Sequence, residues 1–370
     1  MENSKIKVLV VEDSLVFRSL LVKYINADPG LQVIAVANDP FEARDAIVKY
    51  NPDVMTLDIE LPKMTGLEFL KKLMPQFPVR TIVISTLSDK VFEALRAGAV
   101  DFVAKPTSIN RAEVEEFVKN ELPEKIKIAS KARLKLNYSK LQKEQREEKN
   151  EKDIPRREVS TGSGGKDDYI IAIGASTGGT EATTQVLEGL GSNLPGIVVT
   201  QHMPEGFTKM YAERLDHLSS VAVRVKEAEQ GDLVQPGHAY IAPGGDKHME
   251  VVRKDGKYYI HLKAADKVNG HRPSVEVLFE SVAKAAGNKA VGVILTGMGG
   301  DGAKGLLSMR QVGAKTIGQD ESTCVVYGMP RVAYEMGAVE YQEKLGDIPK
   351  KIYYCYDSIT KLARNDERGK

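Results

Sequence analysis

The stretch IKVLVVED, residues 6–13, is a short apolar run that ends in two acidic residues, and it is typical of a buried β-strand at the start of a domain. Four similar runs follow it, each separated from the next by a stretch that favours helix. Such alternation is typical of a parallel sheet with helices on both faces. We therefore expect residues 5–122 to form a flavodoxin-like domain whose five strands have the order 2-1-3-4-5. The four runs are VIAVAN (33–38), VMTLD (54–58), TIVIST (81–86) and DFVAKP (101–106).

The length of the chain indicates more than one domain. Its 370 residues exceed the roughly 100 to 200 residues that share one ordinary hydrophobic core. Lys and Arg together number 52 and Asp and Glu number 51, so no field of one sign surrounds the molecule. Proteins that bind nucleic acid need clustered basic residues for the phosphates, and this balance argues against such a partner.

Several features of the sequence predict a cytoplasmic protein. Cys324 and Cys355 are the only cysteines, and their spacing is not that of a metal site. The first residues, MENSKIKVLV, lack the apolar core of a secretion signal. No apolar stretch approaches the roughly 18 residues that cross a bilayer. We therefore expect any membrane partner to be reached from the cytosol.

Composition changes after the first domain. Residues 111–122, RAEVEEFVKNEL, favour a terminal helix. Residues 123–168 then carry dense charge of both signs, few apolar side chains and several glycines near their end. Such a segment cannot bury enough apolar surface to fold on its own. We expect residues 123–168 to be a charged, flexible linker.

Residues 169–362 repeat the alternation of apolar runs and helical stretches. The segment 238–262 interrupts it with turn signals at Pro243-Gly244 and Asp255-Gly256, flanked by alternating residues that are typical of antiparallel hairpins. We expect a Rossmann-like doubly wound α/β domain with strand order 3-2-1-4-5 and an antiparallel hairpin extension. The runs are YIIAIGAS (169–176), PGIVVTQHM (195–203), VRVKEA (223–228) and AVGVILTGM (290–298).

Acidic residues mark the strand ends of the first domain. Glu12 and Asp13 follow the first strand and Asp58 ends the third, and these strands are neighbours in the predicted order. Carboxylates that converge in this way bind a hard cation such as Mg²⁺. Ser85 and Lys105 end the next two strands, so they could hold the oxygens of a phosphoryl group that Asp58 attacks. A solvated loop or a helix cap would explain one such acid but not the whole set.

A serine lies in the glycine-rich turn GASTGG, residues 174–179, which follows the first strand of the second domain. Its position at a helix N-terminus favours negative charge, so the turn could cradle a phosphate or expose Ser176 as a nucleophile. Dinucleotide binding requires an acid at the end of the next strand. That strand ends in Thr200-Gln201-His202 instead, which favours catalysis.

A serine nucleophile needs a general base and a group that orients that base. His202 is the best-placed base. The strand before the glycine-rich loop of Asp301 should lie on the other side of the Ser176 strand, which makes Asp301 the candidate orienting acid. Backbone amides near Thr177 and Met298 could form an oxyanion hole.

Each of these assignments has a structural alternative. A serine in a glycine-rich turn or an acid before a helix is often a cap, and a histidine at a strand end is often structural. His271 and His248 are rival bases, and His271 could instead line the substrate cleft. His217 and His261 have the character of surface or core residues.

The acidic constellation lies in a segment that resembles the receiver domain of two-component response regulators over almost all of residues 5–120. One departure from that pattern is the short connection between the fourth strand and the fourth helix, STLSDKVFEALRAGA (residues 85–99). It affects the expected geometry of the residues that respond to phosphorylation. The resemblance implies Asp58 as phosphoacceptor, Glu12 and Asp13 as Mg²⁺-binding acids with Asp58, Ser85 as switch hydroxyl, Phe102 as switch aromatic and Lys105 as phosphate-sensing lysine.

Six motifs of the second domain, in this order after a receiver and a linker, resemble the CheB family of chemotaxis protein-glutamate methylesterases. They are IGASTGGTEA (173–182), TQHMPEGFT (200–208), YIAPGGDKH (240–248), NGHRPSVEVLF (269–279), LTGMGGDGAKG (295–305) and VVYGMPRVA (325–333). The resemblance implies Ser176 as nucleophile, His202 as general base and Asp301 as its partner, with Thr177 and Met298 near the oxyanion.

The same resemblance implies the reaction and the partners. Members of this family hydrolyse glutamate γ-methyl esters on methyl-accepting chemotaxis receptors, and many also deamidate receptor glutamines through the same acyl-enzyme. It further implies that the unphosphorylated receiver lies over the serine site, and that phosphoryl transfer from the histidine kinase CheA to Asp58 loosens this contact. No cofactor is expected for the hydrolysis itself.

Three other functions remain open at this stage. The second domain could bind DNA or another protein without catalysis, although the balanced charge argues against DNA. It could be a nucleotide-binding oxidoreductase, whose cofactor binding would survive the loss of Ser176. Deamidation, rather than demethylation, could also be the main reaction of the same serine site.

Overall fold

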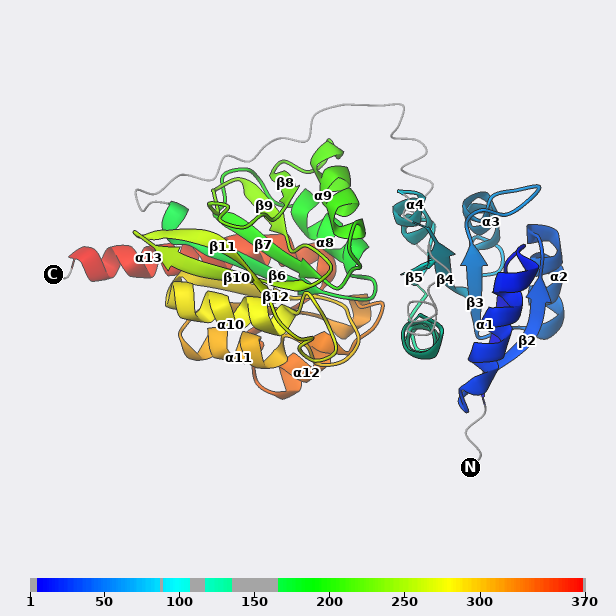
Figure 1. Cartoon of the computed structure of the whole chain (residues 1–370). Helices are drawn as coiled ribbons and strands as arrows, with labels where there is room; N and C mark the ends of the chain where they lie inside the picture. The colour runs from blue at the N-terminus through cyan, green and yellow to red at the C-terminus, as the bar shows by residue number, and fades with distance from the viewer. Residues whose placement is uncertain (1–4, 87–88, 107–116, 135–165, 369–370) are drawn as a thin grey trace. The chain divides into compact units, whose positions relative to one another are not determined.

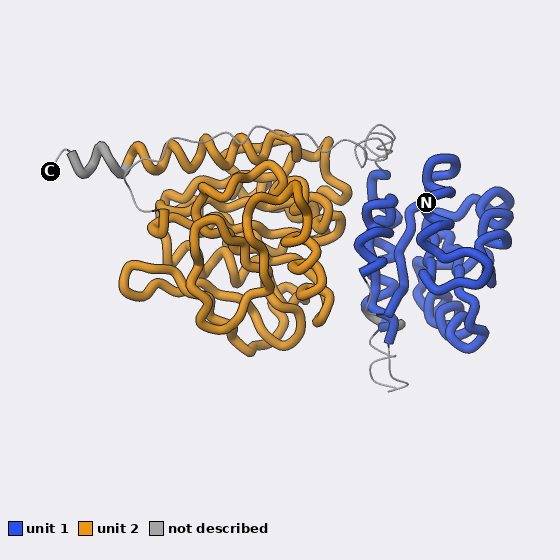
Figure 2. The backbone as a smooth tube through the Cα atoms, turned by 90° about the horizontal axis from the view of Figure 1, so that it is seen from above, with its two compact units in different colours: residues 1–153 blue, residues 154–370 orange. Residues whose placement is uncertain are grey.

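The computed structural model describes residues 5–86, 89–106, 117–134 and 166–368, and it divides the chain into two compact units (Figures 1 and 2). The N-terminal unit spans residues 1–153 and the C-terminal unit spans residues 154–370. Residues 111–116 of the predicted terminal helix and residues 135–165 of the predicted linker lie outside the described residues.

The N-terminal unit contains a five-stranded parallel sheet with the order β2-β1-β3-β4-β5. This confirms the predicted flavodoxin-like topology. Because all strands run in the same direction, the residues that follow β1, β3, β4 and β5 meet at one edge of the sheet. The strands are β1 (Ile6–Val11), β2 (Leu31–Ala37), β3 (Val54–Asp58), β4 (Arg80–Ser85) and β5 (Asp101–Ala104).

Helices cover both faces of this sheet. Side chains fix where three of them begin: Ser14 caps one, Asp39 caps a second, and Thr65 with Glu68 forms a capping box on a third. Helices α2, α3 and α4 pack together on one face, and α1 packs with η1 and α6 on the other. They are α1 (Leu15–Ala27), α2 (Pro40–Tyr50), α3 (Gly66–Leu73), α4 (Lys90–Arg96), the π-helix η1 (Phe117–Glu121) and α6 (Leu122–Ser130).

Helix α6 falls within the range that the sequence assigns to the linker, yet it is bonded to the sheet. Lys125 Nζ donates to Asp101 Oδ1 at 3.0 Å and to the carbonyl oxygen of Phe102 at 2.7 Å. Arg80 Nε donates to the carbonyl oxygen of Ala132 at 2.9 Å. The contacts with this sheet therefore extend along the chain at least to Ala132.

The C-terminal unit contains a seven-stranded sheet with the order β14-β13-β12-β6-β7-β9-β8, in which every pair is parallel. This confirms a Rossmann-like doubly wound fold, and β12 lies beside β6 on the side opposite β7, as predicted. The strands are β6 (Ile170–Ala175), β7 (Gly196–Gln201), β8 (Arg224–Glu227), β9 (His238–Ile241), β12 (Ala290–Ile294), β13 (Lys315–Gln319) and β14 (Tyr341–Glu343).

Two layers of helices enclose this sheet. Helices α10 (Val275–Ala286), α11 (Ala303–Gln311) and α12 (Met329–Glu335) pack together on one face. On the other face lie α8 (Gly179–Glu188), α9 (Phe207–His217) and α13 (Ile348–Arg368). Short 3₁₀ turns complete the unit: η2 (Lys166–Asp168), η3 (Gly287–Lys289), η4 (Glu321–Thr323) and η5 (Leu345–Asp347). None of the described helices has the length and apolar character needed to traverse a bilayer.

The predicted antiparallel extension is partly wrong. Strands β10 (Lys247–Lys254) and β11 (Lys257–Ala264) form the hairpin that the Asp255-Gly256 signal predicts. The residues HAYI, in contrast, form β9, a parallel strand inserted between β7 and β8. The Pro243-Gly244 signal has another cause, because a Cβ on Gly244 would lie 2.5 Å from the backbone of Pro204. This glycine permits a close approach of two loops rather than a hairpin turn.

A second glycine brings helix α10 against the end of strand β6. A Cβ on Gly174 would lie 2.1 Å from Val275 Cγ1 and 3.1 Å from the ring of Phe279. The first turn of α10 can therefore reach the strand end that precedes Ser176. The backbone N–H groups of that first turn, from Val275 and Glu276, donate hydrogen bonds to Asp301.

Replacement of Gly174 by alanine should destabilise the C-terminal unit by about 1–3 kcal/mol, because the added methyl group overpacks a closed contact between strand and helix. Chemical denaturation followed by circular dichroism measures this change. Gly346→Ala is the matched control, since its nearest neighbour, Gln185 Nε2, would lie 3.7 Å from the added carbon. The control should change stability by less than about 0.5 kcal/mol, and equal effects of the two variants would contradict the packing argument.

Candidate functional site

Ser176 lies in the sharp turn between β6 and α8. The turn closes because Gly178 has a φ of 75° and caps the helix. The backbone N–H of Ser176 donates to the carbonyl oxygen of Thr296 at 3.0 Å, which ties the turn to the loop after β12. A Cβ on Gly297 would lie 2.7 Å from Ser176 Cβ, so this loop can approach the serine only with glycine at that position.

His202 follows β7 and joins the serine to an acid. Its Nδ1 lies 3.1 Å from Ser176 Oγ, and its Nε2 lies 2.8 Å from Asp301 Oδ2. A buried carboxylate accepts a hydrogen bond, so Nε2 carries the proton and Nδ1 is free to accept the serine hydroxyl proton. The roles of the two ring nitrogens are reversed relative to the usual serine protease triad.

Asp301 is buried and accepts hydrogen bonds at both oxygens. Besides His202, its donors are Asn269 Nδ2 at 2.8 Å, Ser274 Oγ at 2.7 Å, and the backbone N–H groups of Val275 at 2.7 Å and Glu276 at 3.3 Å. The last two belong to the first turn of α10, where the helix dipole favours an anion. The carboxylate thus has the partners that a buried charge requires.

These contacts determine the pKa of Asp301. Burial by itself would raise the pKa, but the hydrogen bond from His202 and the charge that this ring carries when it is protonated, together with Asn269 and Ser274, hold the pKa at about 2. Burial, with the nearby charge of Asp301, raises the pKa of Glu276. Asp301 is therefore ionised throughout the neutral range and can stabilise a protonated His202.

The rival histidines, His248 and His271, make other contacts in the structure than the one expected of a base. His248 is buried, and its Nε2 lies 2.9 Å from the carbonyl oxygen of Asp266 while its Nδ1 accepts from the backbone N–H of Ser274. Both of its nitrogens are thus occupied. His271 stacks on His202, with ring centroids 3.7 Å apart and an angle of 13° between the planes. His217 contacts the carbonyl oxygen of Glu213, and His261 contacts Gln230.

Two segments beside Ser176 carry the candidate oxyanion donors. Thr177 follows the serine, and its carbonyl oxygen accepts from Thr296 Oγ1 at 3.0 Å. Met298 follows Gly297, whose carbonyl oxygen accepts from the backbone of Met329 at 2.8 Å. The loop after β12 is therefore bonded both to the turn of Ser176 and to the start of α12.

Gln201 is a site residue that sequence reasoning did not identify. It is the last residue of β7, its side chain is buried, and its Nε2 donates to the carbonyl oxygens of Ser176 at 2.9 Å and His202 at 3.2 Å. One amide thus fixes the backbone of both the serine and the histidine. Asn269 and Ser274 were also missed, although both lie within NGHRPSVEVLF, one of the six motifs that carry the family resemblance.

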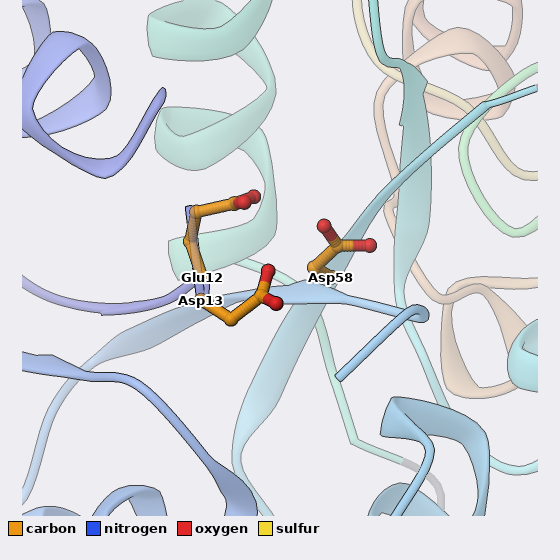
Figure 3. A group of neighbouring side chains, drawn as sticks. All are labelled: Glu12, Asp13 and Asp58. Carbon is orange, nitrogen blue, oxygen red and sulfur yellow. The ribbon is translucent and has the colours of Figure 1, made fainter. Parts of the chain in front are cut away.

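The acidic residues of the N-terminal unit converge as predicted, with Asp58 at the end of β3 and the other two acids just after β1 (Figure 3). One oxygen of each of Glu12, Asp13 and Asp58 lies within 4.8 Å of the others. Lys105 Nζ donates to Asp58 Oδ2 at 2.6 Å and to Glu12 Oε2 at 3.0 Å. Glu12 and Asp58 are buried, whereas Asp13 is exposed.

The charges of this cluster suit a divalent cation. Burial and then the charge of Asp58 raise the pKa of Glu12 to about 7, in spite of the lowering effect of Lys105. The contacts of Lys105 thus do not offset the combined effect of burial and of the Asp58 charge on this carboxyl group. Clustered carboxylate oxygens that are open to solvent on the Asp13 side fit the ligand preference of Mg²⁺.

The two other predicted switch residues lie on the neighbouring strands. Ser85 ends β4, is buried, and accepts from the backbone N–H of Lys105 at 2.7 Å through its carbonyl oxygen. Phe102 lies on β5 and is also buried. It packs edge to face with Phe92 at a centroid distance of 6.5 Å. Residues 87–88 of the connection after β4 lie outside the described residues.

Comparisons with known proteins agree with both halves of this description. Residues 171–352 match the family described as CheB methylesterase, and residues 8–116 match the response regulator receiver domain. A protein-glutamate methylesterase/protein-glutamine glutaminase 2 of Syntrophomonas wolfei is 51% identical over 96% of this chain and 99% of that protein. A protein-glutamate methylesterase/protein-glutamine glutaminase of Bordetella parapertussis is 46% identical over 99% of each chain. The Thermotoga maritima CheB methylesterase catalytic domain, a crystal structure, is 43% identical and covers 50% of this chain and 96% of that chain, with a TM-score of 0.48.

The lowered pKa of Asp301 predicts a specific dependence of stability on pH. A carboxyl whose folded pKa of about 2 lies below its ordinary value of 3.8 contributes stability above the higher value and loses it as the pH falls toward the lower one. The difference in unfolding free energy between wild type and Asp301→Asn should therefore shrink by about 2 kcal/mol as the pH falls through this range. Denaturation curves recorded at several pH values measure it, and a constant or widening difference would contradict the assignment.

Proposed function

Because the chain belongs to the family of CheB protein-glutamate methylesterases/protein-glutamine glutaminases, we propose that it is a phosphorylation-activated serine hydrolase of chemotaxis. Its substrates are glutamate γ-methyl esters on methyl-accepting chemotaxis receptors, and specific receptor glutamines. The observation that carries this proposal is the continuous chain of hydrogen bonds from Ser176 through His202 to Asp301, with lengths of 3.1 and 2.8 Å.

Acylation begins with Ser176. Its Oγ attacks the ester carbonyl carbon while its proton passes to Nδ1 of His202, whose other nitrogen remains bonded to Asp301. The ionised Asp301 stabilises the imidazolium that forms. The tetrahedral intermediate then expels methoxide, which takes the proton from Nδ1 and leaves as methanol. Ser176 is left as an ester of the glutamate side chain.

Deacylation uses the same residues in reverse. Water attacks the acyl carbon and gives a proton to His202, and collapse of the second intermediate returns that proton to Ser176 Oγ. The product is a glutamate carboxyl group. A glutamine substrate follows the same path with ammonia as the leaving group, so one site serves both reactions.

Backbone donors beside the serine stabilise the intermediates. The N–H groups of Thr177 and Met298 are proposed to bind the oxyanion, since their loops are held against each other next to Ser176. The N-terminus of α8 follows the turn directly and adds its dipole to the same charge.

The receiver supplies the control. Asp58 accepts the phosphoryl group, and Glu12, Asp13 and Asp58 would hold Mg²⁺, which neutralises charge on that group during transfer. Lys105 already contacts Asp58 and can move its ammonium to a phosphoryl oxygen. Ser85 at the end of β4 and Phe102 on β5, the next strand along the sheet, are proposed to respond to the new charge.

The partners follow from this role. The phosphodonor is proposed to be the chemotaxis histidine kinase CheA, and the substrates are the cytoplasmic parts of membrane receptors. We place the protein in the cytoplasm, where it reaches the membrane only through those receptors.

Loss of the nucleophile gives the first test. Ser176→Ala should abolish methanol release from methylated receptor cytoplasmic fragments, with a loss on the order of 10³-fold or more, because removal of a triad nucleophile leaves only residual catalysis. Ser192→Ala, an exposed serine of the same unit, is the matched control and should keep full activity. Full activity of Ser176→Ala would eliminate the serine mechanism.

Control by phosphorylation gives the second test. A small-molecule phosphodonor with Mg²⁺ should raise the rate of methanol release by wild type, whereas Asp58→Asn should show no increase because it cannot form the acyl phosphate. Asp45→Asn, which alters an exposed acid of α2, should respond as wild type does. A normal response of Asp58→Asn would reject this residue as the phosphoacceptor.

A further inference from the structure

A tight turn over residues 268–271 lies beside the catalytic triad without belonging to it. Asn269 and Gly270 have φ angles of 53° and 84°, as the two central residues of a two-residue hairpin turn do. The backbone N–H groups of Val268 and His271 each donate to the other residue's carbonyl oxygen, at 3.1 and 2.9 Å. The turn is therefore a closed, well-defined loop.

The two sides of this turn reach two different members of the triad. Asn269 Nδ2 donates to Asp301 Oδ1 at 2.8 Å. His271 stacks on His202, with 3.7 Å between the ring centroids and 13° between the planes. One short loop thus contacts both the acid and the base.

The residue after the turn anchors it to the body of the unit. Arg272 Nε donates to the carbonyl oxygen of Gly245 at 2.8 Å, and Arg272 Nη1 donates to that of Ala265 at 2.8 Å. The guanidinium thus bridges two loops that flank the β10–β11 hairpin. A turn held in this way can restrain the groups that it touches.

His202 needs such restraint because of how it is oriented. Asp301 holds Nε2, at the tip of the ring, while Nδ1 must first face Ser176 and then the leaving oxygen. Two in-plane contacts at the nitrogens do not prevent the ring from tilting out of its plane. A flat ring stacked on one face blocks that tilt, and small errors in position are costly for proton transfer.

We propose that the turn 268–271 is a positioning element of the triad, in which Asn269 fixes the Asp301 carboxylate and His271 fixes the plane of the His202 ring. In this role His271 takes no part in proton transfer. The inference rests on the proposed hydrolase function and assigns two further residues to its site.

The experiment compares two substitutions at His271 in the full-length protein. His271→Ala removes the stacked ring, and His271→Phe keeps a flat ring that cannot carry a proton. His217→Ala, at an exposed histidine of α9, is the control. For each variant, kcat and KM for methanol release are measured with methylated receptor fragments. The rate at which a fluorophosphonate labels Ser176 gives a second readout that needs no receptor.

The proposal expects kcat of His271→Ala to fall on the order of 10- to 100-fold with KM little changed, and expects His271→Phe to recover most of that loss. Labelling rates should follow the same order. A Phe variant as slow as the Ala variant would overturn the proposal, because it would mean that His271 acts through its nitrogens. An Ala variant like wild type, or one altered only in KM, would overturn it as well.

Asn269→Gly tests the other half of the turn. Glycine adopts the left-handed backbone freely, so this variant removes the amide and keeps the turn. We expect kcat to fall roughly 10-fold with KM unchanged, and an unaltered kcat would remove Asn269 from the positioning element. If wild type itself released no methanol, the proposed function would fail, while the labelling rates would still decide whether the turn positions the triad.

Discussion

The site depends on one buried charge, the carboxylate of Asp301 at the first turn of α10. A buried carboxylate is tolerated only with a full set of partners, and here a histidine, two side-chain donors and two backbone amides supply them. Gly174 permits that helix to lie close enough to the strand of the nucleophile. The fold of the C-terminal unit therefore serves to bring a helix N-terminus to the ends of three parallel strands.

Much of both candidate sites follows from the elementary geometry of parallel sheets. The residues after neighbouring strands meet at one edge, which is why Ser176, His202 and Asp301 could be grouped before any distance was known, and why the acids of the receiver could be grouped as well. Strand β9 was not predicted as a parallel strand because it has only four residues and lies beside a Pro-Gly pair. That pair permits a close contact between two loops rather than a hairpin turn. The role of Gln201 was not predicted for another reason. It depends on the direction of the side chain, which the position of the residue in the sequence does not reveal.

Each unit contains a buried carboxyl group, and the surroundings of the two groups shift their pKa values in opposite directions. In the C-terminal unit the donors around Asp301 hold its pKa at about 2, so the charge is fully compensated. In the N-terminal unit burial and then the charge of Asp58 raise the pKa of Glu12 to about 7, although Lys105 contacts both carboxylates. A compensated site keeps one electrostatic state, whereas an under-compensated site changes when a cation or a phosphoryl group arrives. Catalysis benefits from the first property and signalling from the second.

The residues of the triad lie far apart in the sequence, which affects when the site can form during synthesis and folding. Ser176 and His202 are 26 residues apart, but His202 and Asp301 are separated by 99 residues and by the inserted strands and hairpin between them. Such distant pairings form late in folding, because the chain must close a long loop before the contact stabilises it. A nascent chain that has completed its receiver and the first strands of the second sheet still lacks the acid. Hydrolytic activity can thus arise only after Asp301 has been synthesised and has left the ribosome.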